Sequence, residues 1–455
     1  MTPQEQDHKY EQKSIFETSL IDIIDPTHAL VILSHKIDWK NLEQSLGKFY
    51  CQDNGRPGTS TRIMVSLHYL KHTFNLGDES LLSMWVENPY WQYFSGFDTF
   101  QTKPPIDSSS MTKWRNRLKK EGAEKLLAET IQAGLSIKAI KANDLDNVNV
   151  DTTVQEKNIR YPTDSRLYVR CSENLVKIAT KLGIVLRQKY NRVNKRSLLM
   201  QSRYAHARQM KRAKKETKKM RTRLGRLIRD IVRKKDGIVN MALEELLSRA
   251  KKIFTQTKDT KNKIYSVHAP EVSCISKGKA NKRYEFGNKV GIVTTSKGCW
   301  VVGVSSFAGA PYDGHTLAKT LENVKSNLGR ESLRAFTDMG YRNHDYKGDT
   351  EIIIDKKKRG NTPKRLWKWM KRRAAIEPVI GHLKSDNRMN RNKLKGTKGD
   401  EVNAILSGAA FNFRKLMRFI SFFYSFFNSI FSSSFNNIRC LLIIFKNLKQ
   451  NMIAN

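Results

Sequence analysis

The chain has 455 residues and carries 83 lysines and arginines against 43 acids, which gives a formal net charge of +40. Hydrophobic residues make up 39% of it, enough to bury folded cores, so a wholly disordered basic tail is excluded and two or three domains are expected. So large a positive surplus repels itself unless it meets a polyanion, which makes nucleic acid the expected partner, with a ribosome-like RNA coat or a membrane-surface protein as the alternatives.

Residues 1–135 are predicted to form an all-α N-terminal domain. Apolar residues recur at three- and four-residue steps from Arg62 to Phe74, as on one face of a helix, and Asp78 begins a second helix. A basic helix is expected from Met111 to about Leu127. Short helices separated by tight breaks suit a helix-turn-helix-like DNA-binding module, and a plain helical bundle with a solvated basic face also fits the pattern.

Residues 140–418 combine strand and helix signals. Alternating or short apolar runs predict strands at 147–152, 289–295, 299–305, 333–337 and 351–354. Helices are expected at 316–328 and from about 365 to 384, and Ser296, Lys297 and Gly298 form a hairpin-length turn between the second and third strands. This order predicts an α/β fold with a mixed sheet.

A strongly basic insertion, at about 165–285, interrupts this α/β region. Residues 187–235 hold 20 lysines and arginines and only two acids, while Leu224, Leu227, Ile228 and Ile231 fall on one helical face. Because the two signs of charge are not interspersed, we expect a long basic helix or helical pair that faces a DNA backbone. The candidate DNA-contacting residues here are Lys211, Arg212, Lys214, Lys215, Lys218 and Lys219.

Residues 419–455 form a tail rich in phenylalanine and serine. Polar residues such as Asn428 and Arg439 interrupt it, whereas a membrane span needs roughly 20 mostly apolar residues, so a partner-binding helix or a loosely constrained extension is expected and no membrane anchor. The five cysteines are scattered and form no C-x-x-C pair. Free thiols in a reducing cytoplasm follow from that spacing.

Three acids stand out by context, namely Asp151 on the first strand, Asp338 after the strand at 333–337, and Glu377 in a basic helical stretch. Two strand-end aspartates and a helical glutamate can meet at one edge of a sheet, where like charges repel unless cations are bound. Carboxylate oxygens select Mg²⁺ or Mn²⁺, and two such ions can clamp the entering and leaving oxygens of a phosphoryl transfer. Singly, none of the three acids is specific, because an aspartate at a strand end is more often a turn or helix cap.

Two cations accompany Glu377. Arg373 lies four residues before it and Lys384 seven residues after it, so both can share its helical face and hold DNA phosphate against the carboxylate. An ordinary surface pair between Arg373 and Glu377 is the alternative. Pro378 predicts either a bend in the helix at this point or a helix that begins close to Glu377.

These residues together resemble the signatures of DDE-type bacterial insertion-sequence transposases of the IS-five group. The family's last signature is Tyr, Arg, Glu and Lys at fixed spacing, and Arg373, Glu377 and Lys384 reproduce its final three members, with Met370 in place of the tyrosine. The Asp-x-Gly-Tyr signature is present from Asp338 to Tyr341, and the first Asp signature at 151–153. The resemblance covers about residues 20–418.

The resemblance implies an RNase H-like catalytic domain that cleaves transposon ends and transfers the strands into target DNA. Asp151, Asp338 and Glu377 would then be metal ligands for Mg²⁺, with Mn²⁺ as a substitute, while Arg373 and Lys384 would contact DNA. Tyr341 would brace the Asp338 turn or stack on a base. Double-stranded DNA is the implied partner, and a homodimer would join two ends in the bacterial nucleoid. An RNase H-like nuclease without strand transfer, or an inactive DNA-binding relic, remains possible on the same residues.

Overall fold

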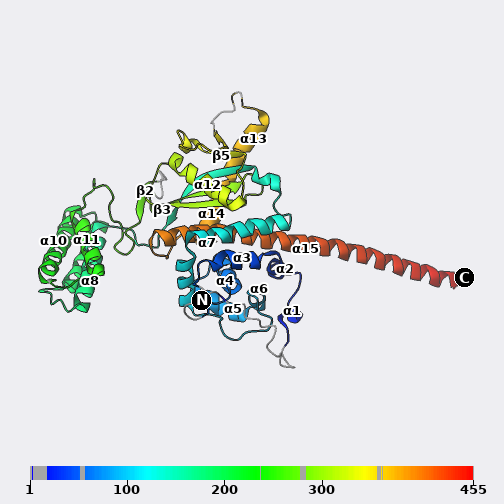
Figure 1. Ribbon diagram of the computed structural model, residues 1–455, viewed down its shortest axis with the longest axis horizontal. Helices are drawn as coiled ribbons and strands as arrows, with labels where there is room; N and C mark the ends of the chain where they lie inside the picture. The colour runs from blue at the N-terminus through cyan, green and yellow to red at the C-terminus, as the bar shows by residue number, and fades with distance from the viewer. Residues whose placement is uncertain are drawn as a thin grey trace.

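The computed structural model describes residues 3, 18–51, 57–235, 237–276, 283–355, 360 and 362–453, with side chains as far as residue 426. The chain is a mixture of helices and strands built around one curled mixed sheet (Figure 1). Along the chain, helices come before, between and after the strands. A long C-terminal helix extends away from the body (Figure 1).

The described residues of the N-terminal region, between 20 and 136, are mostly helical. Its helices are α1 (Leu20–Ile23), α2 (Ala29–Lys36), α3 (Trp39–Gly47), α4 (Thr61–Thr73), α5 (Asp78–Glu87), α6 (Pro89–Phe94) and α7 (Ser108–Ser136). The expected helix at 62–74 is confirmed as α4, nearly every residue of which is buried. Arg115 of α7, one of the basic residues that suggested a DNA-facing helix, is buried instead and forms hydrogen bonds with Asp78.

The sheet has six strands in the order β2-β3-β1-β5-β6, with β4 paired to β3. They are β1 (Asn147–Glu156), β2 (Ser273–Ser276), β3 (Tyr284–Thr295), β4 (Val301–Phe307), β5 (Arg334–Thr337) and β6 (Glu351–Ile354). The β1–β3, β2–β3 and β3–β4 pairs are antiparallel, whereas β1, β5 and β6 run parallel. The mixed sheet expected from the sequence is therefore confirmed.

The strand limits differ from the expected ones, since β1 continues to Glu156 and β3 begins already at Tyr284. Strand β4 begins at Val301 rather than at Cys299, because Gly298 and Cys299 both adopt positive φ angles (79° and 52°) and complete the turn. Strand β2 was not expected, since its four residues carry no run of apolar residues long enough to signal a strand.

The basic insertion contains four helices rather than the single helix or helical pair that we expected. They are α8 (Asp164–Lys181), α9 (Asn191–His206), α10 (Met210–Lys234) and α11 (Met241–Thr255). Apolar residues of all but α9 form the hydrophobic cluster of the insertion, which includes Leu175, Leu224 and Leu247. The buried face of α10 therefore packs against α8, which precedes it in the chain, and against α11, which follows it. Both partner helices lie outside the strongly basic stretch at 187–235. Figure 1 shows α8, α10 and α11 projecting beyond β2, away from the rest of the sheet.

The second half of the sheet region alternates short strands with helices. These are η2 (Asp313–Thr316), α12 (Leu317–Leu328), η3 (Met339–Tyr341), α13 (Lys364–Arg372), η4 (Arg373–Ala375) and α14 (Ile376–Ser385), with η denoting a single 3₁₀ turn; a further one, η1 (Ala142–Leu145), precedes β1. The helix expected at about 365–384 is therefore two α-helices with a 3₁₀ turn between them.

Helix α15 (Gly396–Ile453) crosses the body beside α7 and then extends away from it (Figure 1). Its first half packs on α7, α4 and β4, and Phe413 stacks on Tyr69 with 5.0 Å between ring centroids. One hydrophobic cluster consequently joins the N-terminal helices, the sheet and α15. The predicted limit at 418/419 falls inside this helix, and most side chains of the predicted tail lie outside the described residues. None of the helices described is long and apolar enough to cross a membrane.

A buried polar cluster ties the start of α15 to the end of β1. Lys157 Nζ lies 2.6 Å from Asp400 Oδ1 and 2.9 Å from Glu271 Oε1, and all three side chains are largely buried. Asn288 and Asn392 each donate a hydrogen bond of 2.5 Å to Asp400. Because Glu271 lies near the end of the insertion, this cluster connects β1, the exit of the insertion and α15.

Candidate active site

Asp151 lies on β1, and Asp338 directly follows β5, the strand parallel to β1. Asn149 of β1 pairs with Phe336 of β5, so two residues farther along Asp151 comes level with Asp338. Residues at matching positions of paired strands lie about 5 Å apart. The sequence-based prediction that these two acids meet at one edge of the sheet therefore has a direct basis in the strand register.

Asp338 caps the short turn that follows β5. Its Oδ1 atom accepts a hydrogen bond of 3.0 Å from the backbone N–H of Gly340. A Cβ atom on Gly340 would lie 3.0 Å from Asp338 Oδ1 and 3.3 Å from Asp313 Oδ2. A side chain at this position would therefore crowd two carboxylates.

Asp313, which our sequence analysis did not select, belongs to the same acidic group. Its Oδ1 atom accepts hydrogen bonds from Thr152 Oγ1 at 2.6 Å and from Lys289 Nζ at 2.8 Å. Thr152 directly follows Asp151, so these contacts place Asp313 beside the strand that carries the first acid. Lys289 balances part of the negative charge gathered here.

Tyr341 lies beneath these acids and is only 1% exposed. Its burial, followed by the negative charges of Asp151, Asp313 and Asp338, raises the pKa of the phenol well above its ordinary value. Three carboxylates are therefore within electrostatic reach of one hydroxyl. Two roles were predicted for Tyr341. Its burial is compatible with bracing the Asp338 turn. The ring offers no surface to a base, which corrects the prediction of a DNA contact.

Glu377 lies at the start of α14 and is 64% exposed. The helix begins at Ile376, so Pro378 occupies its first turn, where a missing N–H breaks no helical hydrogen bond. Of the two arrangements that Pro378 predicted, a helix that begins close to Glu377 is the one observed.

The Arg373 guanidinium lies between three carboxylates. Its nitrogen atoms are 3.7 Å from Asp151 Oδ2, 3.7 Å from Asp355 Oδ2 and 3.8 Å from Glu377 Oε1, and the side chain is 13% exposed. The pairing of Arg373 with Glu377, which was the alternative to a DNA contact, is thus present, and Arg373 also links that helical acid to the first strand aspartate.

Asp355 is a further acid that our sequence analysis did not select. Thr337 of β5 pairs with Ile354 of β6, so Asp355 comes level with Asp338 just as Asp151 does on the other side. The backbone N–H of Asp355 donates to Thr337 O at 2.8 Å. The signal that identified Asp338, an acid directly after a short strand, was also present for Asp355.

Polar contacts fix the segment that carries Arg373. The buried side chain of Asn149 donates to the carbonyl of Arg372 at 3.3 Å and accepts from Ser296 Oγ at 2.7 Å. Arg372 Nε in turn donates to the carbonyl of Ser296 at 3.1 Å. Strand β1 therefore holds both Asp151 and the backbone next to Arg373.

Comparisons with known proteins identify the family. Residues 18–117 match a model described as "Transposase domain (DUF772)", and residues 337–417 match one described as "Transposase DDE domain". The chain is 48% identical over 198 residues to "Uncharacterized protein ORF8 in nfe locus" of Rhizobium meliloti. The matched region covers 44% of this chain and 95% of that protein. The chain belongs to the insertion-sequence transposases. No solved structure matches it.

The second matched segment of the transposase begins at Thr337 and contains Asp338, Asp355 and Glu377, whereas Asp151 lies between the two matched segments. The DDE domain assignment therefore applies to the strands and helix that carry three of the acids. Asp151 is therefore placed at this site by the strand register and not by a matched segment.

The donor set of the transposase suits a hard divalent cation. Asp151, Asp338 and Glu377 offer carboxylate oxygens, which Mg²⁺ and Mn²⁺ prefer, and transposases with a DDE domain generally use a divalent metal. Among the residues that the structure describes, no three acids, histidines or cysteines surround a common metal position. Glu377 contacts Arg373 instead, and its side chain is largely exposed.

The remaining predicted DNA contacts of the transposase lie on two surfaces. Lys384 of α14 lies 3.9 Å from Glu285 Oε2 and lines a groove of about 1100 Å³ with Arg388, Arg391 and Lys393. Met370, at the position of the family's tyrosine, is buried on α13. The six candidate residues of the insertion are all exposed along the first half of α10, namely Lys211, Arg212, Lys214, Lys215, Lys218 and Lys219.

Proposed function

We propose that this transposase binds the terminal repeats of an insertion sequence of the IS-five group, cleaves the DNA at the element's ends and joins those ends to target DNA. The observation that carries the proposal is the alignment of Asp151 on β1 with Asp338 directly after the parallel strand β5, with Arg373 linking Asp151 to Glu377. The order of the sheet, with β1 between an antiparallel and a parallel neighbour, supports an RNase H-like catalytic domain at 140–418.

In this proposal Asp151, Asp338 and Glu377 hold two divalent ions, Mg²⁺ or Mn²⁺. When bound, these ions supply a Lewis acid for the scissile phosphate and lower the pKa of the attacking water or 3′-hydroxyl. Arg373 contributes a fixed positive charge beside the carboxylates and, once Glu377 turns toward the aspartates, its guanidinium is available to a DNA phosphate. Lys289 and Thr152 hold Asp313 in place next to Asp151.

The other parts of the chain would position the DNA. Residues 1–135 would form an N-terminal DNA-binding domain, and the insertion at about 165–285 would contact the DNA backbone through its basic helices. A homodimer would bring two transposon ends together. Because the substrate is chromosomal DNA, the protein would act at the nucleoid of a bacterial cell.

The experiment that tests the proposal uses the full chain with a labelled duplex that carries a terminal repeat from the element's own locus. Reactions with Mg²⁺, Mn²⁺ or EDTA are resolved for cut ends and for joined strands. We expect metal-dependent cleavage at the repeat end and joined products, both lost in Asp338→Asn, while the affinity for DNA is kept.

Asp349→Asn is the matched control, because Asp349 is an exposed aspartate in the same segment between β5 and β6. It should cleave like the unchanged chain. Cleavage without joined products would replace the proposal by an RNase H-like nuclease. Tight binding without cleavage in either metal would leave an inactive DNA-binding protein.

A further inference from the structure

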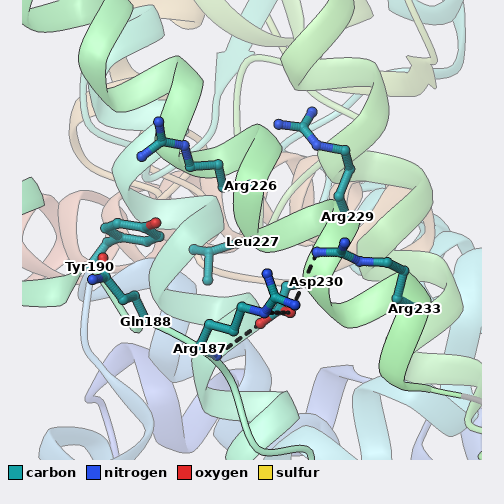
Figure 2. Close-up of a pocket in the computed structure, with 8 residues that line it drawn as sticks. All are labelled: Arg187, Gln188, Tyr190, Arg226, Leu227, Arg229, Asp230 and Arg233. Atoms are coloured by element: carbon teal, nitrogen blue, oxygen red, sulfur yellow. Dashed lines mark hydrogen bonds and ion pairs between the residues drawn. The ribbon is translucent and has the colours of Figure 1, made fainter.

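A cavity of about 310 Å³ opens on the helical insertion, at the end of α10 that lies away from the predicted lysine-rich half. Figure 2 shows the side chains that line it, which are Arg187, Gln188, Tyr190, Arg226, Leu227, Arg229, Asp230 and Arg233. Four of these eight residues are arginines and one is an acid. We call this cavity the arginine pocket.

Asp230 organises one side of the arginine pocket. Its side chain is 8% exposed, accepts a hydrogen bond of 2.9 Å from the backbone N–H of Arg187, and lies 3.8 Å from Arg233 Nη2 and 3.5 Å from Lys234 Nζ. Burial alone would raise the pKa of Asp230, but the Arg187 hydrogen bond and the Lys234 charge hold it below its ordinary value. This carboxylate is therefore charged and paired with the basic groups around it.

Arg226 and Arg229 form the other side of the arginine pocket and are not neutralised. In Figure 2 the dashed lines join Arg187 and Arg233 to Asp230, while the guanidinium groups of Arg226 and Arg229 extend from α10 without such a contact. Within the described part of the chain, no hydrogen bond or ion pair is found for either side chain. The pocket thus keeps a net positive charge, with two planar forks available to an anion.

Phosphate suits this arrangement better than a compact carboxylate does. The two parallel N–H groups of a guanidinium match two oxygens of a carboxylate or of a phosphate, but only a phosphate has further oxygens that a second guanidinium can share. The half-buried ring of Tyr190 closes one wall of the pocket, held there by a left-handed backbone (φ 56°) at the start of α9.

The arginine pocket continues a longer cationic face of α10. At 100° per residue, Lys211, Lys215, Arg226, Arg229 and Arg233 fall within a 60° arc of the helix, and all five are exposed. At 1.5 Å per residue they span about 33 Å, close to one turn of duplex DNA. A linear face of this length fits a linear polyanion rather than a single small anion.

We propose that the arginine pocket binds one backbone phosphate of duplex DNA that lies along α10. The inference rests on the proposed function for the identity of the ligand, and it adds a defined contact point that is separate from the acids and from Lys384. The phosphate takes its hydrogen bonds from Arg226 and Arg229, while Asp230 keeps Arg187 and Arg233 at the rim.

The first experiment measures binding of the full chain to a 40-base-pair duplex from the element's terminal repeat, by fluorescence anisotropy at several salt concentrations without divalent metal. We expect Arg226→Ala/Arg229→Ala to weaken binding by roughly tenfold or more and, because one phosphate contact is lost, to reduce the slope of log K against log salt by about 0.9. Lys251→Ala/Lys252→Ala is the control with the same loss of charge, since both are exposed on α11 outside the pocket. It should weaken binding by less than about threefold.

Charge-conserving replacements separate a phosphate fork from diffuse attraction. Arg226→Lys/Arg229→Lys keeps the net charge and should keep the salt slope, but should still lose about fivefold in affinity because lysine lacks the planar fork. A scan of the duplex with single neutral methylphosphonates should reveal one position that weakens binding of the unchanged chain and has no effect on the alanine variant.

Each outcome decides the proposal. Equal binding by the pocket and control variants, or full affinity of the lysine variant, would overturn the arginine pocket as a phosphate site. If the unchanged chain binds no duplex, the inference and the proposed function fail together. If the variants and the scan behave as expected but no cleavage occurs with metal, the pocket stands and the catalytic proposal fails.

Discussion

Replacing Lys157 by methionine tests the buried cluster that ties β1 to α15. The methionine keeps the length of the side chain but leaves Asp400 and Glu271 without the cation that now lies within 3 Å of both. Removing one partner from a buried ion pair costs about 3–5 kcal/mol of the free energy of unfolding, because the remaining charge is uncompensated. We expect a loss in that range at pH 8.

The loss should depend on pH in a defined way. Burial raises the pKa of Asp400 to about 6 even with Lys157 present, so the stability linked to this carboxyl is full at low pH and declines as the pH rises through 6. Without the cation the pKa rises further. The cost of Lys157→Met should therefore shrink by about 1.4 kcal/mol per unit as the pH falls from 8 to 6, and then stay constant.

The assay is urea unfolding followed by tryptophan fluorescence at pH 8 and pH 6. Lys393→Met, an exposed lysine of the neighbouring loop, is the control and should change the free energy of unfolding by less than about 0.5 kcal/mol. Adding Asp400→Asn to Lys157→Met should recover about 1–3 kcal/mol at pH 8, because it removes the orphaned charge. A loss below about 1 kcal/mol at pH 8, or an equal loss at both pH values, would refute the reasoning.

Three further outcomes are expected from single replacements. Burial raises the pKa of Glu129 to about 7, so Glu129→Gln, which still accepts from the Asp38 N–H, should gain up to about 2 kcal/mol above pH 7 and nothing below pH 4.5 in thermal unfolding. Gly287→Ala would place a Cβ atom 1.9 Å from the Gln155 carbonyl and should cost about 3 kcal/mol by urea unfolding, whereas a neutral result would contradict the close β1–β3 approach. Asp355→Asn should slow cleavage roughly tenfold by loosening Arg373, and an unchanged rate would remove Asp355 from the site.

Much of the sheet could be predicted because its strands carry their own local signal. Alternating valines mark β1, a short isoleucine run marks β6, and acids directly after strands pointed to Asp151 and Asp338. The pairing of Arg373 with Glu377 followed from their four-residue spacing. These features depend only on residues that are close in the sequence.

Other features depend on contacts between distant segments and could not be predicted. Thr152 meets Asp313 across 161 residues, and nothing near either residue announces that contact. The burial of Tyr341 follows from how the turn after β5 packs, not from the turn sequence itself. The sequence predicted only one or two helices in the insertion. That prediction rested on the charge of residues 187–235 and not on the apolar spacing of α8 and α11, which lie outside this stretch.

The shared core has a consequence for the order in which the chain can fold. Tyr69 and Phe94 of the N-terminal helices complete their packing only against Phe413, more than 300 residues later. Contacts of such long sequence separation form slowly, and apolar surface stays uncovered until they do. A fragment that ends with the first matched segment at residue 117 would therefore expose the faces that α15 covers, and we expect it to aggregate rather than to behave as an independent DNA-binding module.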